Sequence, residues 1–352
     1  MNDAPFRPLT DAEIAAAIAA APVPPPEPDT FRKRLRRFRR LVAHALLAPV
    51  EVMLVRTAIA VIPRLSRRHA LALARFAGGT AFRLSRRDNR HMAANLDLIY
   101  GPARDPDERR RFMRAVWNHT ALVVVDCFWF LRDTHRRVTE WVEIDDTLKA
   151  ISRGTEGCAA ITAHLGNWEL AAHAMCEDGR KLTSVFAPIG TPYTQKKLLA
   201  SREVSGQHLV PKQGAVLNLL RCYRRRQIIG LLLDQYTKVT EGGLFVDILG
   251  VPAPISRIAG TIHARCGCPL YIAACIHVGG GRYRAQAFAT LPSGSGLSEE
   301  KATRWVADKL SDMIRRYPDQ WLWMYRRWRH VRPGDDPARY PFYAHSFNPL
   351  ID

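Results

Sequence analysis

Short apolar runs alternate with helix-patterned segments from residue 151 to residue 316 of this 352-residue chain. The runs have the length of buried strands, and the segments between them have the spacing of amphipathic helices. We predict strands at 158–163, 181–187, 227–233, 244–248, 269–277 and 282–290, and helices at 168–178, 191–205, 213–225, 255–266 and 299–316. This alternation predicts an α/β fold with a mostly parallel central sheet flanked by helices.

The sequence before residue 151 has a different character and divides the chain. Residues 64–150 have helical periodicity, and the adjacent glycines at 78 and 79 give room for close packing between helices. We predict four regions from these shifts in composition. They are a flexible Pro/Ala-rich tail at 1–30, a basic run with membrane-associated helices at 31–87, a main domain at 88–330, and a C-terminal tail at 331–352.

A dense cationic run at 32–40 precedes a mostly apolar stretch at 41–62 that contains Glu51 and Arg56. A transmembrane helix needs about 20 apolar residues, and charges within it are costly unless they pair or face protein. We therefore expect a helix that lies in or dips into the bilayer, with the cations on anionic headgroups. The cations would keep that end cytoplasmic. An amphipathic core helix of a soluble protein is the alternative.

The chain carries 52 Lys+Arg against 33 Asp+Glu, a formal net charge of +19. A surface this basic favours a polyanionic partner, which is a nucleic acid, an anionic membrane or an acidic protein. Seven cysteines without repeated spacing indicate reduced thiols in a cytosolic compartment. The pair Cys266-x-Cys268 is too short and too isolated for a zinc site, so we expect no metal.

A histidine and a carboxylate follow the predicted strand 158–163. His164 comes directly after the strand, and Glu169 lies at the start of the next helix. On one continuous helix the two side chains would point about 140° apart. A turn at His164, with Asn167 as the helix N-cap, would let the carboxylate fold back onto the imidazole. Such a base can deprotonate a hydroxyl, which makes acyl transfer plausible, although most pairs with this spacing are surface or capping residues.

A second polar pair, Asp234-Gln235, closes the predicted strand 227–233. Ligands of parallel sheets bind at the carboxyl ends of the strands, where His164 also falls. Two roles are open for the pair, which are hydrogen bonds that hold the His164 turn and direct contact with substrate. Near the C-terminus, Trp321, Trp323, Tyr325 and Trp328 alternate with arginines and would either sit at headgroup level, line an acyl channel or pack in the core.

In this order, the motifs resemble the lipid A biosynthesis (late) acyltransferase family of the lysophospholipid-acyltransferase-like superfamily. The resemblance runs from about Arg64 to His330 and rests on Asn95-Leu96, the His164–Glu169 segment, Arg202, Leu233-Asp234-Gln235, the run from Gly243 to Ala253, and the run from Pro318 to Trp328. Asp247 and Leu249 depart from the residues expected in the family. These departures leave the reaction class unchanged and leave the acceptor and the acyl length open.

The resemblance implies a membrane-associated O-acyltransferase at the cytoplasmic face of the inner membrane. It would move a fatty acyl chain from an acyl carrier protein thioester to a hydroxyl of a lipid A precursor or related glycolipid, without a cofactor. His164 would be the general base, oriented by Glu169. Arg202, Asn167, Asp234 and Gln235 would bind substrate, with Arg202 near the acceptor phosphate or the thioester. The partners would be the carrier protein, a phosphorylated glycolipid and an anionic membrane, and not nucleic acid.

Two other functions remain open from the residues. One is acyl transfer to another lipid acceptor, an aminolipid or a glycosylated phospholipid. The other is a non-catalytic cationic protein that binds membranes or nucleic acid through arginines at 32–40, 109–114 and 224–226. The glycerol-phosphate acyltransferases are disfavoured, because their Glu-Gly-Thr-Arg block is missing from the segment around 240–243.

Overall fold

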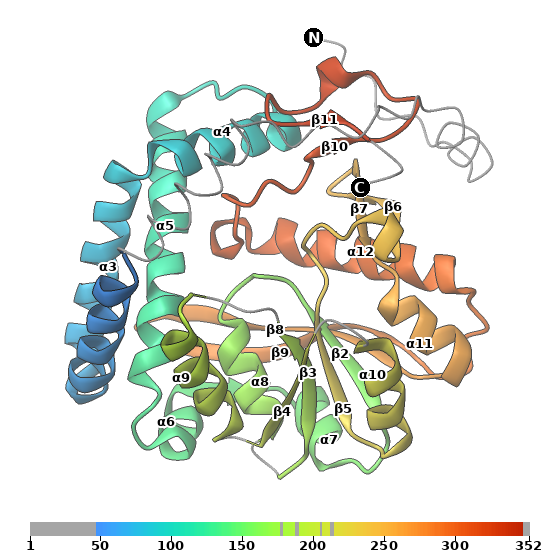
Figure 1. Ribbon diagram of the computed structural model, residues 1–352, viewed down its shortest axis with the longest axis horizontal. Helices are drawn as coiled ribbons and strands as arrows, with labels where there is room; N and C mark the ends of the chain where they lie inside the picture. The colour runs from blue at the N-terminus through green and yellow to red at the C-terminus, as the bar shows by residue number, and fades with distance from the viewer. Residues whose placement is uncertain (1–46, 177–178, 187–189, 205, 212–214, 348–352) are drawn as a thin grey trace.

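The computed structural model describes residues 47–347, apart from 177–178, 187–189, 205 and 212–214 (Figure 1). The tail predicted at 1–30 and the basic run at 32–40 therefore lie outside the described residues.

A seven-stranded sheet forms the centre of the molecule, in the order β1-β9-β8-β2-β5-β3-β4 (Figure 1). The run from β8 to β4 is parallel throughout, whereas β9 is antiparallel to β8 and parallel to β1. The strands are β1 (Val142–Ile144), β2 (Cys158–Thr162), β3 (Leu182–Phe186), β4 (Gln207–Pro211), β5 (Ile228–Leu232), β8 (Leu270–Gly279) and β9 (Arg282–Leu291). The predicted α/β fold with a mostly parallel sheet is confirmed.

Helices cover both faces of this sheet. On one face, buried side chains of α10 (Ala215–Arg224), α11 (Ile258–Cys266) and α12 (Glu299–Arg316) pack against every second residue of β2 and β5. On the other face, α7 (Asp146–Arg153) and α8 (Trp168–Cys176) pack against the alternate residues. Because β2 is buried on both faces, its sequence Cys-Ala-Ala-Ile-Thr is apolar almost throughout.

A helical arm stands beside the sheet (Figure 1). It consists of α3 (Arg67–Leu84), α4 (Arg86–Tyr100), α5 (Pro106–Trp129) and α6 (Thr134–Trp141), preceded by the 3₁₀ turn η1 (Ile62–Arg64). Helices α3 and α5 cross at Gly78, where an added Cβ would come within 2.6 Å of the Asn118 Cα. The close packing expected at the glycine pair therefore occurs at Gly78.

Residues 47–61 are helical and rest on the start of α9 (Pro192–Glu203). The Glu51 carboxylate accepts hydrogen bonds from the Thr191 N–H (2.7 Å) and the Thr194 hydroxyl (2.5 Å). Arg56 lies over the ring of Tyr193. Both charged side chains of this helix thus face protein. Within the described residues, no helix combines the length and the apolar character that crossing a membrane requires.

A separate antiparallel hairpin corrects part of the predicted pattern. Strands β6 (Gly243–Ile248) and β7 (Val251–Ser256) pair with each other outside the central sheet, after the short turn η2 (Val239–Glu241). The helix predicted from residue 255 begins only at Ile258. Two prolines conceal β7 in the sequence, since proline has no N–H to donate to a neighbouring strand. The strand tolerates them because it pairs with β6 on one edge and needs no partner on the other.

The C-terminal segment packs back on the helical arm. After η3 (Pro318–Gln320), β10 (His330–Val331) pairs in parallel with β11 (His345–Ser346), and the turn η4 (Pro337–Arg339) lies between them. The Tyr343 hydroxyl donates to the Asn95 side-chain oxygen on α4. Residues 331–347, predicted as a tail, are therefore attached to the main body of the protein.

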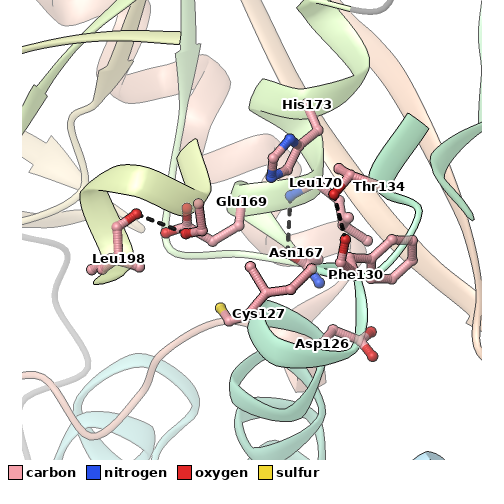
Figure 2. A pocket seen from close by; sticks show the side chains of 11 residues that line it. Asp126, Cys127, Phe130, Thr134, Asn167, Glu169, Leu170, His173 and Leu198 are labelled. Carbon is pink, nitrogen blue, oxygen red and sulfur yellow. Dashed lines mark hydrogen bonds between the residues drawn. The ribbon is translucent and has the colours of Figure 1, made fainter. Parts of the chain in front are cut away.

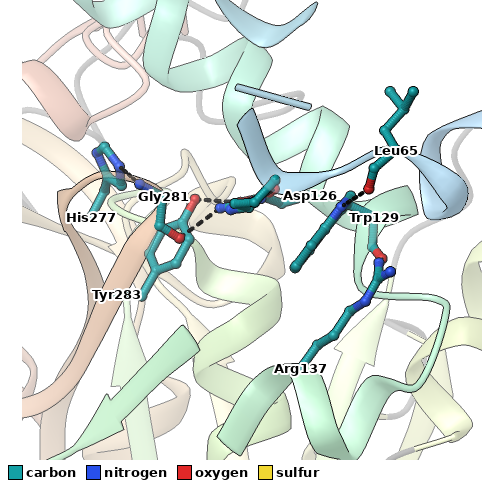
Figure 3. Close-up of polar contacts among 8 residues, drawn as sticks. Leu65, Asp126, Trp129, Arg137, His277, Gly281 and Tyr283 are labelled. Atoms are coloured by element: carbon teal, nitrogen blue, oxygen red, sulfur yellow. Dashed lines mark hydrogen bonds and ion pairs between the residues drawn. The ribbon is translucent and has the colours of Figure 1, made fainter. Parts of the chain in front are cut away.

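A buried ion pair ties the arm to the sheet (Figure 3). The Arg67 guanidinium on α3 makes two hydrogen bonds to the Asp126 carboxylate on α5 and donates to the Gly281 carbonyl (2.7 Å). The Tyr283 hydroxyl on β9 donates to the same carboxylate (2.5 Å). All three side chains are buried. An added Cβ at Gly281 would meet Arg67, so the hairpin glycine has a packing role as well as a turn role.

Candidate active site

A tight turn carries His164 from the end of β2 into α8. Gly166 in this turn has φ +62°, and an added Cβ would lie 2.2 Å from the Cys275 carbonyl oxygen on β8. Glycine is therefore required here for both its conformation and its lack of a side chain. The Asn167 N–H donates to the same Cys275 oxygen (2.7 Å), which fixes the turn against the neighbouring strand.

Asp234 holds His164 through two hydrogen bonds. The backbone N–H of His164 donates to Asp234 Oδ2 (3.0 Å), and Nδ1 of its ring lies 2.8 Å from Asp234 Oδ1. Thr162 on β2 pairs with Leu232 on β5. His164 and Asp234 each come two residues after this pair, so they leave the sheet side by side. Of the two roles left open for Asp234, the structure shows the hydrogen bonds that hold the turn.

The second ring nitrogen of His164 faces Gln235. His164 Nε2 lies 3.3 Å from Nε2 of Gln235, and the Trp168 ring packs edge-on against the imidazole at 5.0 Å between centroids. The His164 side chain is 20% exposed, whereas that of Asp234 is 4% exposed. The partly exposed imidazole therefore keeps Nδ1 against the buried Asp234 carboxylate and Nε2 beside the Gln235 amide.

Each member of the His164–Asp234 pair shifts the pKa of the other toward its charged form. Burial lowers the pKa of His164, but the charge of Asp234 and its hydrogen bond outweigh burial, and the pKa is raised above its usual value. For Asp234, burial raises the pKa, while the charge of His164 and hydrogen bonds from His164 and Trp321 lower it to about 2. Asp234 is thus ionised at neutral pH, and His164 is a stronger base than a free histidine.

Glu169 is engaged by Arg202 in the place where a bond to His164 was predicted. Arg202 on α9 donates from Nε (2.8 Å) and from a terminal nitrogen (2.6 Å) to the two Glu169 oxygens. The charge of Glu169 still raises the pKa of the imidazole, while the charge of the Arg202 that binds it lowers that pKa. The reason for the difference is directional, because Glu169 lies in the first turn of α8 and reaches α9, while Asp234 lies directly beside the His164 turn.

Asn167 caps α8, as its position before the helix predicts. Its side-chain oxygen accepts from the Leu170 N–H (3.1 Å), and its carbonyl accepts from the Ala171 N–H. The cap places the N–H groups of the first turn at the same edge as His164.

The C-terminal tryptophan segment completes the site, and its three tryptophans are buried. The Trp321 indole N–H donates to Asp234 Oδ2 (2.9 Å), and the Leu322 N–H donates to the His164 carbonyl (3.1 Å). Trp323 and Trp328 each pack edge-on against Trp321. Core packing is therefore the role of Trp321, Trp323 and Trp328, and headgroup anchoring is excluded for these three.

His119 on α5 also touches the His164 turn and was not anticipated. Its Nε2 lies 3.1 Å from the Gly166 carbonyl, and burial lowers its pKa to about 4. His119 is therefore neutral at pH 7 and supports the turn by a hydrogen bond. The helical pattern around His119 does not predict this contact, because the contact depends on how the helical arm packs on the sheet.

A small cavity lies beside Glu169, between α5, α8 and α9 (Figure 2). Its volume is about 20 Å³, room for about one water molecule. The lining includes Cys127, Leu170, His173 and Leu198. Separately, the described residues contain no cluster of three or more His, Cys, Asp or Glu side chains that could hold a metal ion.

The chain was compared with models of known protein families. A family model described as bacterial lipid A biosynthesis acyltransferase matches residues 37–330, most of the chain and all of the elements that build the His164 site. No curated protein matches the sequence.

Proposed function

The chain belongs to the bacterial lipid A biosynthesis acyltransferase family, and on that premise we propose that it transfers an acyl chain from acyl carrier protein to a hydroxyl of a lipid A precursor, with His164 as the general base. The observation that carries the proposal is the His164–Asp234 pair at the carboxyl edge of a parallel sheet, in which the carboxylate binds Nδ1 and not Nε2.

The hydrogen bonds decide which nitrogen acts. An ionised carboxylate only accepts hydrogen bonds, so Nδ1 carries the proton that it donates to Asp234. In the neutral imidazole Nε2 is then unprotonated, and this form takes the proton of the acceptor hydroxyl. When the imidazolium forms, the adjacent carboxylate stabilises it. Asp234 therefore performs the orienting role that the sequence assigned to Glu169.

In the proposed reaction, the hydroxyl oxygen attacks the thioester carbonyl as His164 removes its proton. The tetrahedral intermediate then collapses, the C–S bond breaks, and the leaving thiolate takes the proton from the imidazolium. The N–H groups of Trp168 and Glu169, in the first turn of α8, are the proposed donors to the oxyanion. Arg202 positions Glu169, and the stabilisation of the imidazolium by the Glu169 charge is offset in part by the charge of Arg202.

Direct transfer fits the state of the nearby thiols. Burial raises the pKa of Cys127, which lines the cavity beside Glu169. Burial also raises the pKa of Cys158, at the start of β2, to about 12. Both cysteines are thus protonated at neutral pH and are poor nucleophiles. A base that activates the acceptor itself requires neither of them.

The charge balance supports the proposed partners. The net charge of +19 favours encounter with an acidic carrier protein and with an anionic membrane that presents a phosphorylated acceptor. We propose that the protein works at the cytoplasmic face of the inner membrane. Exposed apolar residues of the 47–61 helix, Leu47, Met53 and Leu54, would contact the lipid there.

The test is an assay of the purified protein with acyl carrier protein thioesters and a lipid A precursor. Mass spectrometry should show one added acyl chain on the glycolipid, and His164→Ala should abolish the addition. His208→Ala is the matched control, because His208 is an exposed histidine on β4, away from the site. Wild-type protein that acylates none of the glycolipid acceptors would overturn the proposal.

A further inference from the structure

A cationic groove lies between α4 and the C-terminal segment. Its volume is about 210 Å³, enough for a phosphate group and part of the sugar that bears it. Its lining is polar apart from one methionine and consists of Arg87, Asp88, His91, Met324, Tyr325, Arg326 and Arg329. A lining of this kind suits a charged headgroup and not an acyl chain.

Asn95 fixes the two walls of this groove relative to each other. It is 1% exposed and lies one helical turn beyond His91 on α4. Its amide donates to the carbonyls of Trp323 (2.7 Å) and Tyr325 (2.9 Å). These hydrogen bonds hold the segment that carries Arg326 opposite Arg87. The shape of the groove is therefore fixed by buried contacts.

The arginines of the groove lack acidic partners. Arg87, Arg326 and Arg329 form no ion pair within the described part of the chain, and Asp88 is the one acid in the lining. Burial lowers the pKa of His91, and the charges of Arg326 and Arg87 lower it further. The local field is therefore strongly positive and favours a multiply charged anion.

The groove is connected to the His164 centre by consecutive contacts. Arg329 lies over the ring of Tyr236 at 5.1 Å, and Tyr236 follows Gln235, whose amide lies 3.3 Å from His164 Nε2. By contrast, Arg202 has both Glu169 oxygens on its guanidinium, so its charge is largely balanced. A remote phosphate on the acceptor would find its countercharge in the groove.

We propose that the groove formed by Arg87, His91, Arg326 and Arg329 binds a phosphate group of the acceptor lipid while the acceptor hydroxyl lies at His164. This inference rests on the proposed function. The groove distinguishes phosphorylated from unphosphorylated acceptors, because a phosphate monoester carries nearly two negative charges and matches guanidinium donors in geometry.

The experiment compares two acceptors that differ only in the phosphate, in neutral detergent micelles. The groove variant is Arg87→Gln/Arg326→Gln. The control is Arg224→Gln/Arg225→Gln, which removes the same charge from two exposed arginines at the end of α10. We expect the groove variant to raise KM for the phosphorylated acceptor at least tenfold and to reduce the preference in kcat/KM for that acceptor toward unity. The control should keep the preference.

Equilibrium binding of the two acceptors to the same proteins separates this inference from the proposed function. Wild-type protein that binds the phosphorylated acceptor more tightly but transfers no acyl chain would refute the reaction and support the groove. Arg326→Lys, which keeps the charge, should recover part of the preference and shows that the loss is not due to misfolding. Equal binding of both acceptors by wild-type protein, or equal preference in the groove and control variants, would overturn the inference. So would a groove variant that loses only binding to anionic vesicles.

Discussion

At the scale of single residues, the charge of Asp234 determines how basic His164 is. Burial alone lowers the pKa of the imidazole, and the charge of Asp234 with its hydrogen bond more than reverses this effect. Glu169 is bound by Arg202 and does not contact His164, so it raises the pKa of the imidazole only through its charge. The two acids therefore act on one base in different ways, and substitution separates them.

Asp234→Asn should keep the shape of the site and remove its charge. The pKa of His164 should then fall, because burial remains and the compensating charge is lost. We expect kcat to fall by about 10³-fold, since an imidazolium without its carboxylate is poorly stabilised. The acidic limb of the kcat/KM profile should move to lower pH. A smaller loss than in Glu169→Gln, with an unshifted limb, would return the orienting role to Glu169.

The His164–Asp234 pair also makes the free energy of unfolding depend on pH. The pKa of Asp234 is about 2 in the folded protein and near 3.9 when unfolded, so its contribution is present above pH 4 and is lost as pH falls through 2. Between pH 5 and pH 3, this group alone should remove about 1 kcal/mol of unfolding free energy. Urea unfolding at both pH values should show that difference between wild type and Asp234→Asn, and equal pH slopes would contradict it.

At the scale of elements, adjacent glycines in α3 have opposite surroundings. Gly78 touches the backbone of α5, whereas an added Cβ at Gly79 would meet only arginine side chains at 3.6 Å and beyond. The packing of the arm therefore depends on one position of the pair.

Gly78→Ala should separate α3 from α5 and destabilise the protein by about 1–3 kcal/mol. Gly79→Ala is the matched control and should stabilise it by up to about 1 kcal/mol through better helix propensity. Thermal unfolding of both variants measures the difference, and a stabilised Gly78→Ala protein would be incompatible with the crossing described here.

The elements also show what a sequence of this kind reveals. Strands β2 and β5 and helix α12 were predicted to within one or two residues, because uninterrupted apolar runs and amphipathic spacing are local signals. Strand β7 was hidden by its prolines, and the three-residue β1 is too short to leave a pattern.

For the site, the sequence placed His164 and Asp234 at the same sheet edge. It did not reveal that β2 and β5 are neighbours, which is a long-range property. The pairing of His164 with Asp234 and of Glu169 with Arg202 therefore required the structure.

At the scale of the whole molecule, the Arg67–Asp126–Tyr283 network joins the first helix of the arm to the last strand of the sheet. The pair is almost fully removed from water, and Arg67 also lies over the Trp129 ring at 4.6 Å. Breaking one partner of such a pair leaves an uncompensated buried charge.

Asp126→Asn should therefore cost about 3–5 kcal/mol of unfolding free energy. Tyr283→Phe removes one hydrogen bond to the same carboxylate and should cost about 1.5–3 kcal/mol. Denaturant unfolding compares the two with Asp312→Asn, which removes an exposed carboxylate of α12 and should change little. A loss in Asp126→Asn no larger than in Asp312→Asn would show that the network does not hold the arm.

The brace from Trp321 and Leu322 to the His164 turn has a consequence for biosynthesis. The strand that bears the histidine leaves the ribosome well before the segment that locks it. A nascent chain that has not yet reached Trp321 therefore presents His164 without this support, and the turn is braced only after Trp321 and Leu322 have been synthesised.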